Sequence, residues 1–128
     1  MSIHSEATLD RKFIEFMKLL NVYLNHFPKY EKYGLTLQIR NTAFEMYGYI
    51  VESQKRFHKK TSLTNLDIKH EQLRMFIRLA YELGYFAFRD GSFIFSSDEK
   101  AEHRYLTISS RIDELGKMIG GWINSQKE

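Results

Sequence analysis

Few residues are spaced for metal chemistry. Asp67 and His70 lie three residues apart, and Glu99 and His103 lie four apart, so each pair could share one face of a helix. A di-iron site in a four-helix bundle needs two Glu-x-x-His pairs and two further glutamates, which these residues do not supply. The other three histidines are scattered: His4, His26 and His58. We therefore expect no metal and no cofactor, and we interpret the histidines as solvated surface residues.

The chain also lacks the residues of common catalytic sites. It has no cysteine, which excludes disulfides, thiolate metal sites and a cysteine nucleophile. It has no glycine-rich phosphate loop, no G-x-S-x-G elbow and no H-E-x-x-H motif. These absences favour a protein that binds over one that catalyses, and we assign no catalytic residue.

Basic residues gather in one part of the chain. The net charge is only +3, but residues 28–60 hold seven lysines and arginines against three glutamates, a surplus of four. Four of the seven lie close together: Lys55, Arg56, Lys59 and Lys60. The simpler interpretation is a solvated helix end, because cations suit a helix C-terminus. In a symmetric oligomer the patch would repeat around a ring, and phosphate backbones would then be its natural partner.

Four segments with helical apolar periodicity must position these residues. They cover residues 9–27, 29–58, 65–85 and 98–124. Short links between long amphipathic helices predict antiparallel neighbours. The expected fold is therefore all-α, an antiparallel up-and-down four-helix bundle that forms a single domain over residues 1–128.

Several residues are suited to start or bend these helices. Thr8 is a plausible N-cap of the first segment, and a kink is expected near Gly34 in the second. Two pairs have the spacing of a capping box: Thr64 with Asp67, and Ser96 with Glu99.

The second segment carries two apolar stripes, which we expect to form one wide face that touches more than one neighbour. One stripe is Leu37, Phe44, Tyr47 and Val51, and the other is Ile39, Ala43, Met46 and Ile50. In the third segment we expect Leu79 and Leu83 to widen the buried stripe in the same way.

Residues 86–95 carry the signal of a β-hairpin. Asp90-Gly91 lies between alternating apolar residues, and this pair favours a two-residue turn. In that register Phe88 faces Phe93 and Phe86 faces Phe95, with all four rings on one side of the ribbon as a candidate interface. The alternative is that the third helix runs on to Phe88 and the rest is a loop packed on the bundle.

The last segment contains three glycines at a cost in helix propensity: Gly116, Gly120 and Gly121. We interpret them as places where another helix approaches closely. Trp122 lies on the apolar seam of the same segment, and we expect it to anchor the core or a subunit interface.

No stretch approaches the roughly 18 apolar residues of a membrane helix. The first residues also have no basic region followed by an apolar run. We expect a cytoplasmic protein with no membrane contact.

Three stretches resemble a known family. Residues 73–83, 114–123 and 27–40 are similar to the third, closing and second helices of bacterial four-helix proteins related to the accessory variability determinant (Avd) of diversity-generating retroelements. The second segment also resembles ribosomal RNA intervening-sequence proteins. The likeness covers most of residues 10–124, and its motifs are structural. The phenylalanine-rich segment departs from the family pattern, in which a short polar turn joins the last two helices.

The resemblance implies a four-helix bundle that assembles as a homopentamer and is encoded by a bacterium or a phage. It also implies a non-enzymatic partner of a reverse transcriptase that contacts template RNA, or DNA, through a basic surface while an error-prone cDNA is made. On this basis we place contacts to polymerase or nucleic acid at seven residues: Arg40, Lys55, Arg56, Lys59, Lys60, Arg74 and Arg78. One alternative is a chromosomal four-helix scaffold of the intervening-sequence type without a reverse transcriptase partner, and another is a small metalloenzyme with its site in the bundle core.

Overall fold

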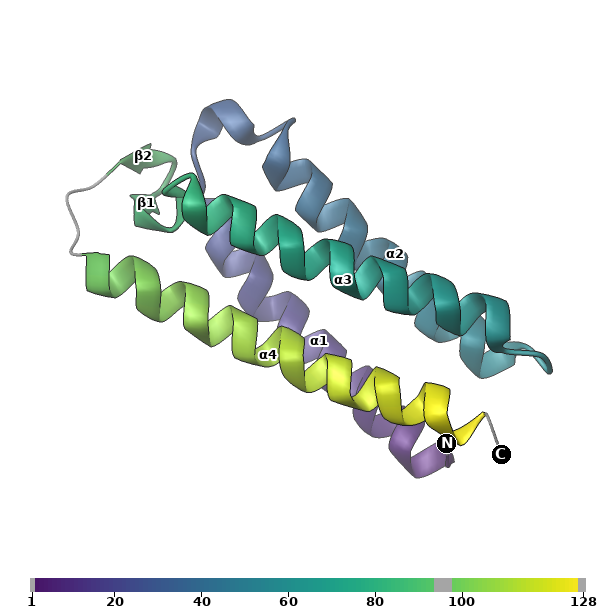
Figure 1. Cartoon of the computed structure of the whole chain (residues 1–128). Coiled ribbons are helices and arrows are strands. Elements are labelled where there is room, and N and C mark those ends of the chain that lie inside the picture. Colours follow the sequence, from purple (N-terminus) through teal and green to yellow (C-terminus); the bar gives the residue numbers. More distant parts are fainter. Residues whose placement is uncertain (1, 94–97, 127–128) are drawn as a thin grey trace.

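The computed structural model describes residues 2–93 and 98–126, and four long helices dominate this part of the chain (Figure 1). They are α1 (Ile3–His26), α2 (Leu35–Lys55), α3 (Lys60–Glu82) and α4 (Asp98–Ser125). Successive helices run in opposite directions, so both ends of the chain lie beside the α2–α3 turn (Figure 1). The expected antiparallel four-helix bundle is confirmed.

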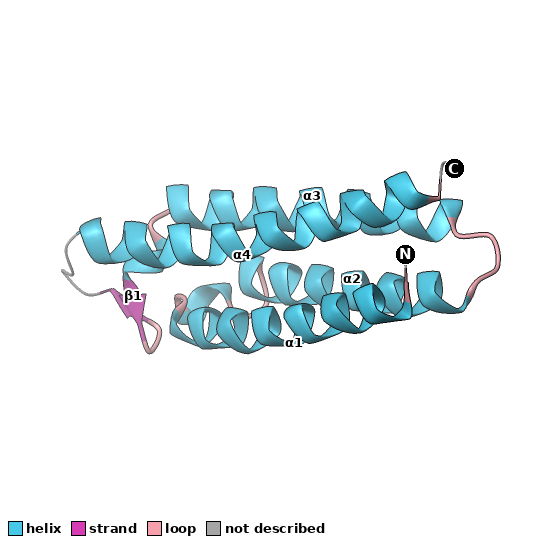
Figure 2. Cartoon of the chain, turned by 90° about the horizontal axis from the view of Figure 1, so that it is seen from below, coloured by secondary structure: helices cyan, strands magenta, loops and turns pink. Residues whose placement is uncertain are grey.

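The helices form two layers, α1 with α2 and α3 with α4 (Figure 2). The core between them is built from one stripe of each helix. In α1 and α4 the buried residues follow the helical periodicity expected of these segments: Leu9, Phe13, Phe16, Leu20 and Leu24, and Ile108, Ile112, Leu115, Ile119 and Trp122. The Trp122 side chain is fully buried, so it anchors the core of this chain.

The prediction of a wide buried face on α2 is wrong. Ile39, Met46 and their stripe are buried, whereas Leu37, Phe44 and Val51 are exposed. The reason is geometric, because residues two apart on a helix point about 200° apart and cannot both face one core. The same error places Leu79 in the core of α3, where it is exposed two positions after buried Ile77. Leu83 is exposed as well.

Helices α1 and α3 begin earlier than predicted. Ser2 caps α1, since its Oγ accepts a hydrogen bond from the N–H of Ser5 at 3.1 Å. Thr8 and Thr64 lie inside helices, where each hydroxyl donates to the carbonyl four residues earlier. Threonine in a helix often bonds to the backbone in this way. The Ser96 capping box falls outside the described residues, while Glu99 lies in the first turn of α4.

The expected kink near Gly34 is a full break between two elements. A short 3₁₀ helix, η1 (Lys29–Glu31), precedes Gly34, and α2 starts at Leu35. At its other end α2 stops at Lys55, because the next residue, Arg56, adopts an extended conformation.

The Asp90-Gly91 turn joins β1 (Phe88–Arg89) and β2 (Ser92–Phe93). Both turn residues have positive φ, 51° and 81°, as this type of hairpin turn requires. Phe88 pairs with Phe93 as predicted. Phe95 falls outside the described residues.

Phe86 does not belong to the hairpin, so its place in the predicted interface is wrong. Gly84 ends α3 with a φ of 82°, and the chain then forms a second 3₁₀ helix, η2 (Tyr85–Ala87). This turn buries the Phe86 ring instead of leaving it on a ribbon. Its centroid lies 5.3 Å from that of Phe27 and 6.0 Å from that of Tyr105.

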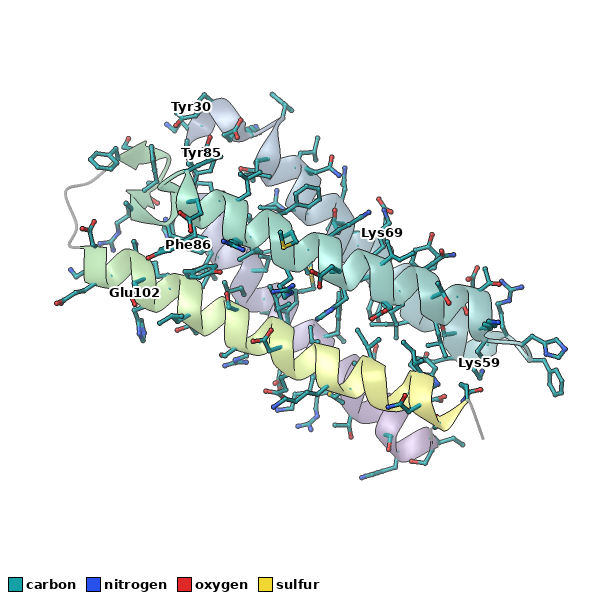
Figure 3. The ribbon with its side chains drawn as sticks, viewed as in Figure 1. Tyr30, Lys59, Lys69, Tyr85, Phe86 and Glu102 are labelled. Atoms are coloured by element: carbon teal, nitrogen blue, oxygen red, sulfur yellow. The ribbon has the colours of Figure 1, made fainter. Side chains whose placement is uncertain are left out.

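An aromatic cluster around Phe86 fastens the hairpin end of the bundle (Figure 3). Arg104 of α4 donates a hydrogen bond to the Phe86 carbonyl at 2.8 Å. Tyr85 donates its hydroxyl hydrogen to Glu31 at 3.1 Å, which ties η2 to η1. Burial, and then this bond to a carboxylate, raise the pKa of Tyr85 to about 12.

The hairpin also binds the end of α1. The N–H group of Asp90 donates to Nδ1 of His26, and the N–H group of Gly91 donates to the carbonyl oxygen of His26.

Candidate nucleic-acid and protein interfaces

The turn between α2 and α3 carries the densest group of predicted binding residues. Lys55 ends α2 and Lys60 begins α3, so both lie at the tip of the bundle. Between them Phe57 is 91% exposed, and its ring packs against that of His58 at a centroid distance of 4.9 Å. Exposed aromatic rings beside cations form stacking platforms for single-stranded nucleic acids.

Lys59, by contrast, binds the backbone of its own chain. Its Nζ donates to the carbonyls of Ser53 at 2.5 Å and Arg56 at 2.7 Å, which satisfies two acceptors at the end of α2. The last carbonyls of a helix lack partners within it, and lysine can supply one. Figure 3 shows Lys59 beside the α2–α3 turn. Arg56 is also engaged, in an ion pair with Glu52 at 3.7 Å.

The other predicted binding residues do not join this group. Arg40 lies on the side of α2 that faces α1, where its Nε donates to Asn21 at 3.4 Å. It is fifteen residues from Lys55, a distance of about 22 Å along the helix.

Arg74 and Arg78 belong to α3. Arg74 binds Glu71 through both its Nε and an Nη, at 3.1 Å and 2.5 Å. The hydrogen bond from Arg74 holds the pKa of Glu71 below its usual value. The hydrogen bond to Glu71 and, to a smaller extent, the charge of Asp113 on α4 raise the pKa of Arg74. Arg40 and Arg74 belong to different layers of the bundle, since Arg40 lies on α2 and Arg74 on α3 (Figure 2).

The glycines of α4 have different surroundings. A Cβ at Gly116 would collide with the imidazole of His70, whose Nε2 is 2.8 Å from the carbonyl oxygen of Ile112. Gly116 thus permits a close approach of α3, and His70 is a packed residue rather than the solvated one we expected. Added Cβ atoms at Gly120 and Gly121 would meet nothing within 4 Å in the described part of the chain.

An apolar groove between α1 and α2 is the surface that the sequence reasoning missed. Its volume is about 550 Å³. It is lined by Phe13, Ile14, Met17, Lys18, Asn21, Phe44, Tyr47 and Gly48. The lining residue Tyr47 is held in place because its ring stacks on Phe13 and its hydroxyl donates to Asp10 at 2.7 Å. Exposed apolar patches of this kind mark protein contacts.

Part of the signal for this groove was present in the sequence. Leu37, Phe44 and Val51 recur every seven residues, which is the spacing of a seam between packed helices. Of the three, Phe44 lines the groove, whereas we expected this stripe to widen a face that touches neighbouring helices. On the hairpin, Phe88 is half-buried and Phe93 is 56% exposed, and their two rings pack edge to face at a centroid distance of 5.6 Å.

Two negative findings apply to residues 2–93 and 98–126. No cluster of three or more histidine, aspartate or glutamate side chains there could hold a metal ion. Nor is any helix in those ranges long and apolar enough to span a bilayer.

The sequence matches the model of a known protein family. The model of a family described as bAvd-like matches residues 7–126, which include nearly all of α1 and the whole of the other three helices. No curated protein and no solved structure shows significant similarity to the sequence.

The structural role of Lys59 can be tested by removing its charge. We expect Lys59→Met to lower the free energy of unfolding by about 0.5–1.5 kcal/mol for each lost carbonyl contact, because two acceptors at the end of α2 lose their donor. Lys100→Met removes an exposed charge from α4 and should change stability by less than about 0.5 kcal/mol. Urea unfolding followed by circular dichroism measures both, and equal stability of the two variants would contradict the capping role.

Proposed function

The chain belongs to the bAvd-like family, and on that premise we propose that it is a non-catalytic accessory protein of a diversity-generating retroelement. In this role it binds the reverse transcriptase and template RNA, or DNA, and supports mutagenic cDNA synthesis in the cytoplasm of a bacterium. The observation that carries the proposal is the length of the family match, from residue 7 to residue 126. The match includes both the basic turn and the apolar groove.

In this proposal two surfaces bind different partners. The α2–α3 turn would bind nucleic acid, because Lys55 and Lys60 flank the exposed ring of Phe57. The α1–α2 groove would bind protein, because its lining is mostly apolar and lies on two long helices. The resemblance to Avd proteins implies a homopentamer, and we assign the groove to the contact between copies. A ring of this type uses a heterologous contact, in which the groove receives a different surface of the next copy.

The partner enzyme gives the most direct test of the proposal. A tagged full-length chain should co-purify the reverse transcriptase encoded beside its gene, together with RNA that contains the template repeat. A gene neighbourhood with no reverse transcriptase and no paired repeats would contradict the proposal and favour a chromosomal four-helix scaffold.

The basic turn should account for much of the RNA affinity. We expect the double variant Lys55→Glu with Lys60→Glu to bind a 20-nucleotide oligouridylate more weakly. If each lysine neutralises one phosphate, the plot of the logarithm of the association constant against the logarithm of the salt concentration should become less steep by about 1.4. Each contact to a single strand contributes about 0.7 to this slope. Fluorescence anisotropy over a salt series measures both quantities.

The matched control is Lys100→Glu with Lys117→Glu, which makes the same change of net charge on α4. It should keep the affinity and the salt slope nearer to those of the wild type. If the two double variants weaken binding equally, the turn is only a solvated helix end and RNA responds to net charge alone.

The groove should control assembly. Phe44 is 55% exposed in this chain, so Phe44→Glu should leave the fold intact and place a charge in the contact between copies. We expect the wild type to form an oligomer in light scattering after size exclusion, and Phe44→Glu to be a monomer.

Leu106→Glu on α4 provides the control for assembly, because Leu106 is also 55% exposed but does not line the groove. It should keep the wild-type mass. A monomeric wild type at micromolar concentration would argue against the homopentamer, and an oligomeric Phe44→Glu would move the contact to another surface.

A further inference from the structure

A row of aromatic rings is exposed at the hairpin end of the bundle. Tyr30 of η1 is 71% exposed, and Phe93 of β2 is 56% exposed. The half-buried ring of Phe88 connects them, because its centroid lies 6.3 Å from that of Tyr30 and 5.6 Å from that of Phe93. The row therefore joins two segments that are far apart in the chain.

Contacts behind the row hold η1 against the hairpin. Tyr30 lies next to Tyr85 (Figure 3), with a centroid distance of 6.1 Å, and the Tyr85 hydroxyl donates to Glu31. At the hairpin turn a Cβ on Gly91 would collide with the side chain of Lys29, so the aliphatic part of this lysine packs on the turn. The exposed rings are thus held in place before any partner arrives, which lowers the entropy cost of binding.

Three cations accompany the rings. Lys29 begins η1, Lys32 follows it, and Arg89 lies in β1. All three are exposed, and none of them forms an ion pair with another residue in the described ranges 2–93 and 98–126. These cations remain available to phosphate groups of a bound strand.

The two acids of the same segments have partners of their own. Glu31 accepts the hydrogen bond from Tyr85 at 3.1 Å, and the carboxylate of Asp90 lies 3.4 Å from Nδ1 of His26. η1, the residue after it and the hairpin together hold three cations against these two acids. The surface therefore keeps a positive charge beside its rings.

Exposed rings beside cations favour single-stranded nucleic acid over protein as the partner. Unpaired bases stack on aromatic rings while lysine and arginine follow the phosphates. Protein interfaces also use aromatic residues, but lysine is depleted in them. The α1–α2 groove shows the contrast, because Lys18 is the one charged residue that lines it in the described part of the chain.

We propose that this hairpin platform, which consists of Tyr30, Phe88 and Phe93 with Lys29, Lys32 and Arg89, binds unpaired bases of a single-stranded nucleic acid. The bases stack on the exposed rings, and the cations contact the adjacent phosphates. The identity of the strand as template RNA, or DNA, rests on the proposed function. The platform and the α2–α3 turn lie at opposite ends of the bundle (Figure 1), separated by the 21 residues of α2, about 32 Å. A strand that contacts both sites runs along the bundle.

Two substitutions at Tyr30 test the stacking. Tyr30→Leu keeps an apolar side chain but removes the ring, whereas Tyr30→Phe keeps the ring. With a 20-nucleotide oligouridylate as the probe in fluorescence anisotropy, we expect Tyr30→Leu to weaken binding by at least about fivefold and Tyr30→Phe to bind as the wild type does. Phe44→Leu removes a ring of similar exposure from the α1–α2 groove and should keep the affinity. Circular dichroism checks that each variant is folded.

A second pair of measurements separates stacking from charge. The salt dependence of binding should be the same in Tyr30→Leu as in the wild type, because no cation is lost. Lys29→Gln with Lys32→Gln should make that dependence less steep by about 1.4. The wild type should bind an abasic strand of equal length more weakly than the oligouridylate, and Tyr30→Leu should narrow this difference by about fivefold.

Equal affinities of Tyr30→Leu and Tyr30→Phe for the oligouridylate would overturn the platform. If Tyr30→Leu keeps this affinity but no longer co-purifies the reverse transcriptase, the surface binds protein and the inference is also overturned. A wild type that binds no oligonucleotide overturns the platform, while co-purification of the reverse transcriptase still tests the proposed function independently.

Discussion

A bundle of four helices can bury only one stripe of each helix, and the rest of this structure follows from that limit. α1 and α4 bury their apolar stripes in the core, and Phe13 and Trp122 are among the largest buried side chains. α2 has two apolar stripes and can bury one of them. The stripe left outside, which contains Phe44, forms part of a groove that suits another protein. In the proposed function, the surplus of apolar residues in α2 serves binding rather than folding.

The sequence was sufficient for features that depend on local spacing. The seams of α1 and α4 and the Asp90-Gly91 turn follow from residues close together in the chain, and all three were predicted correctly. The choice between the two stripes of α2 was not local, because each stripe alone has helical spacing. Phe86 was misplaced for a related reason, since a left-handed Gly84 starts a turn that alternation of apolar residues does not reveal.

Local spacing in the sequence reveals even less about the candidate sites. The charge pattern and the family resemblance assigned Lys59, Arg56 and Arg74 to polymerase or nucleic acid. Their hydrogen bonds and ion pairs depend on neighbours that only the folded chain supplies.

The antiparallel order of the helices also has a practical consequence for anyone who handles this protein. The start of α1 and the end of α4 both lie beside the α2–α3 turn, far from the hairpin (Figure 1). An affinity tag or fluorescent fusion at either terminus will crowd Phe57 and its neighbouring lysines while it leaves the hairpin end unobstructed. Labels meant to report on nucleic acid at the turn are better attached at the opposite end of the bundle.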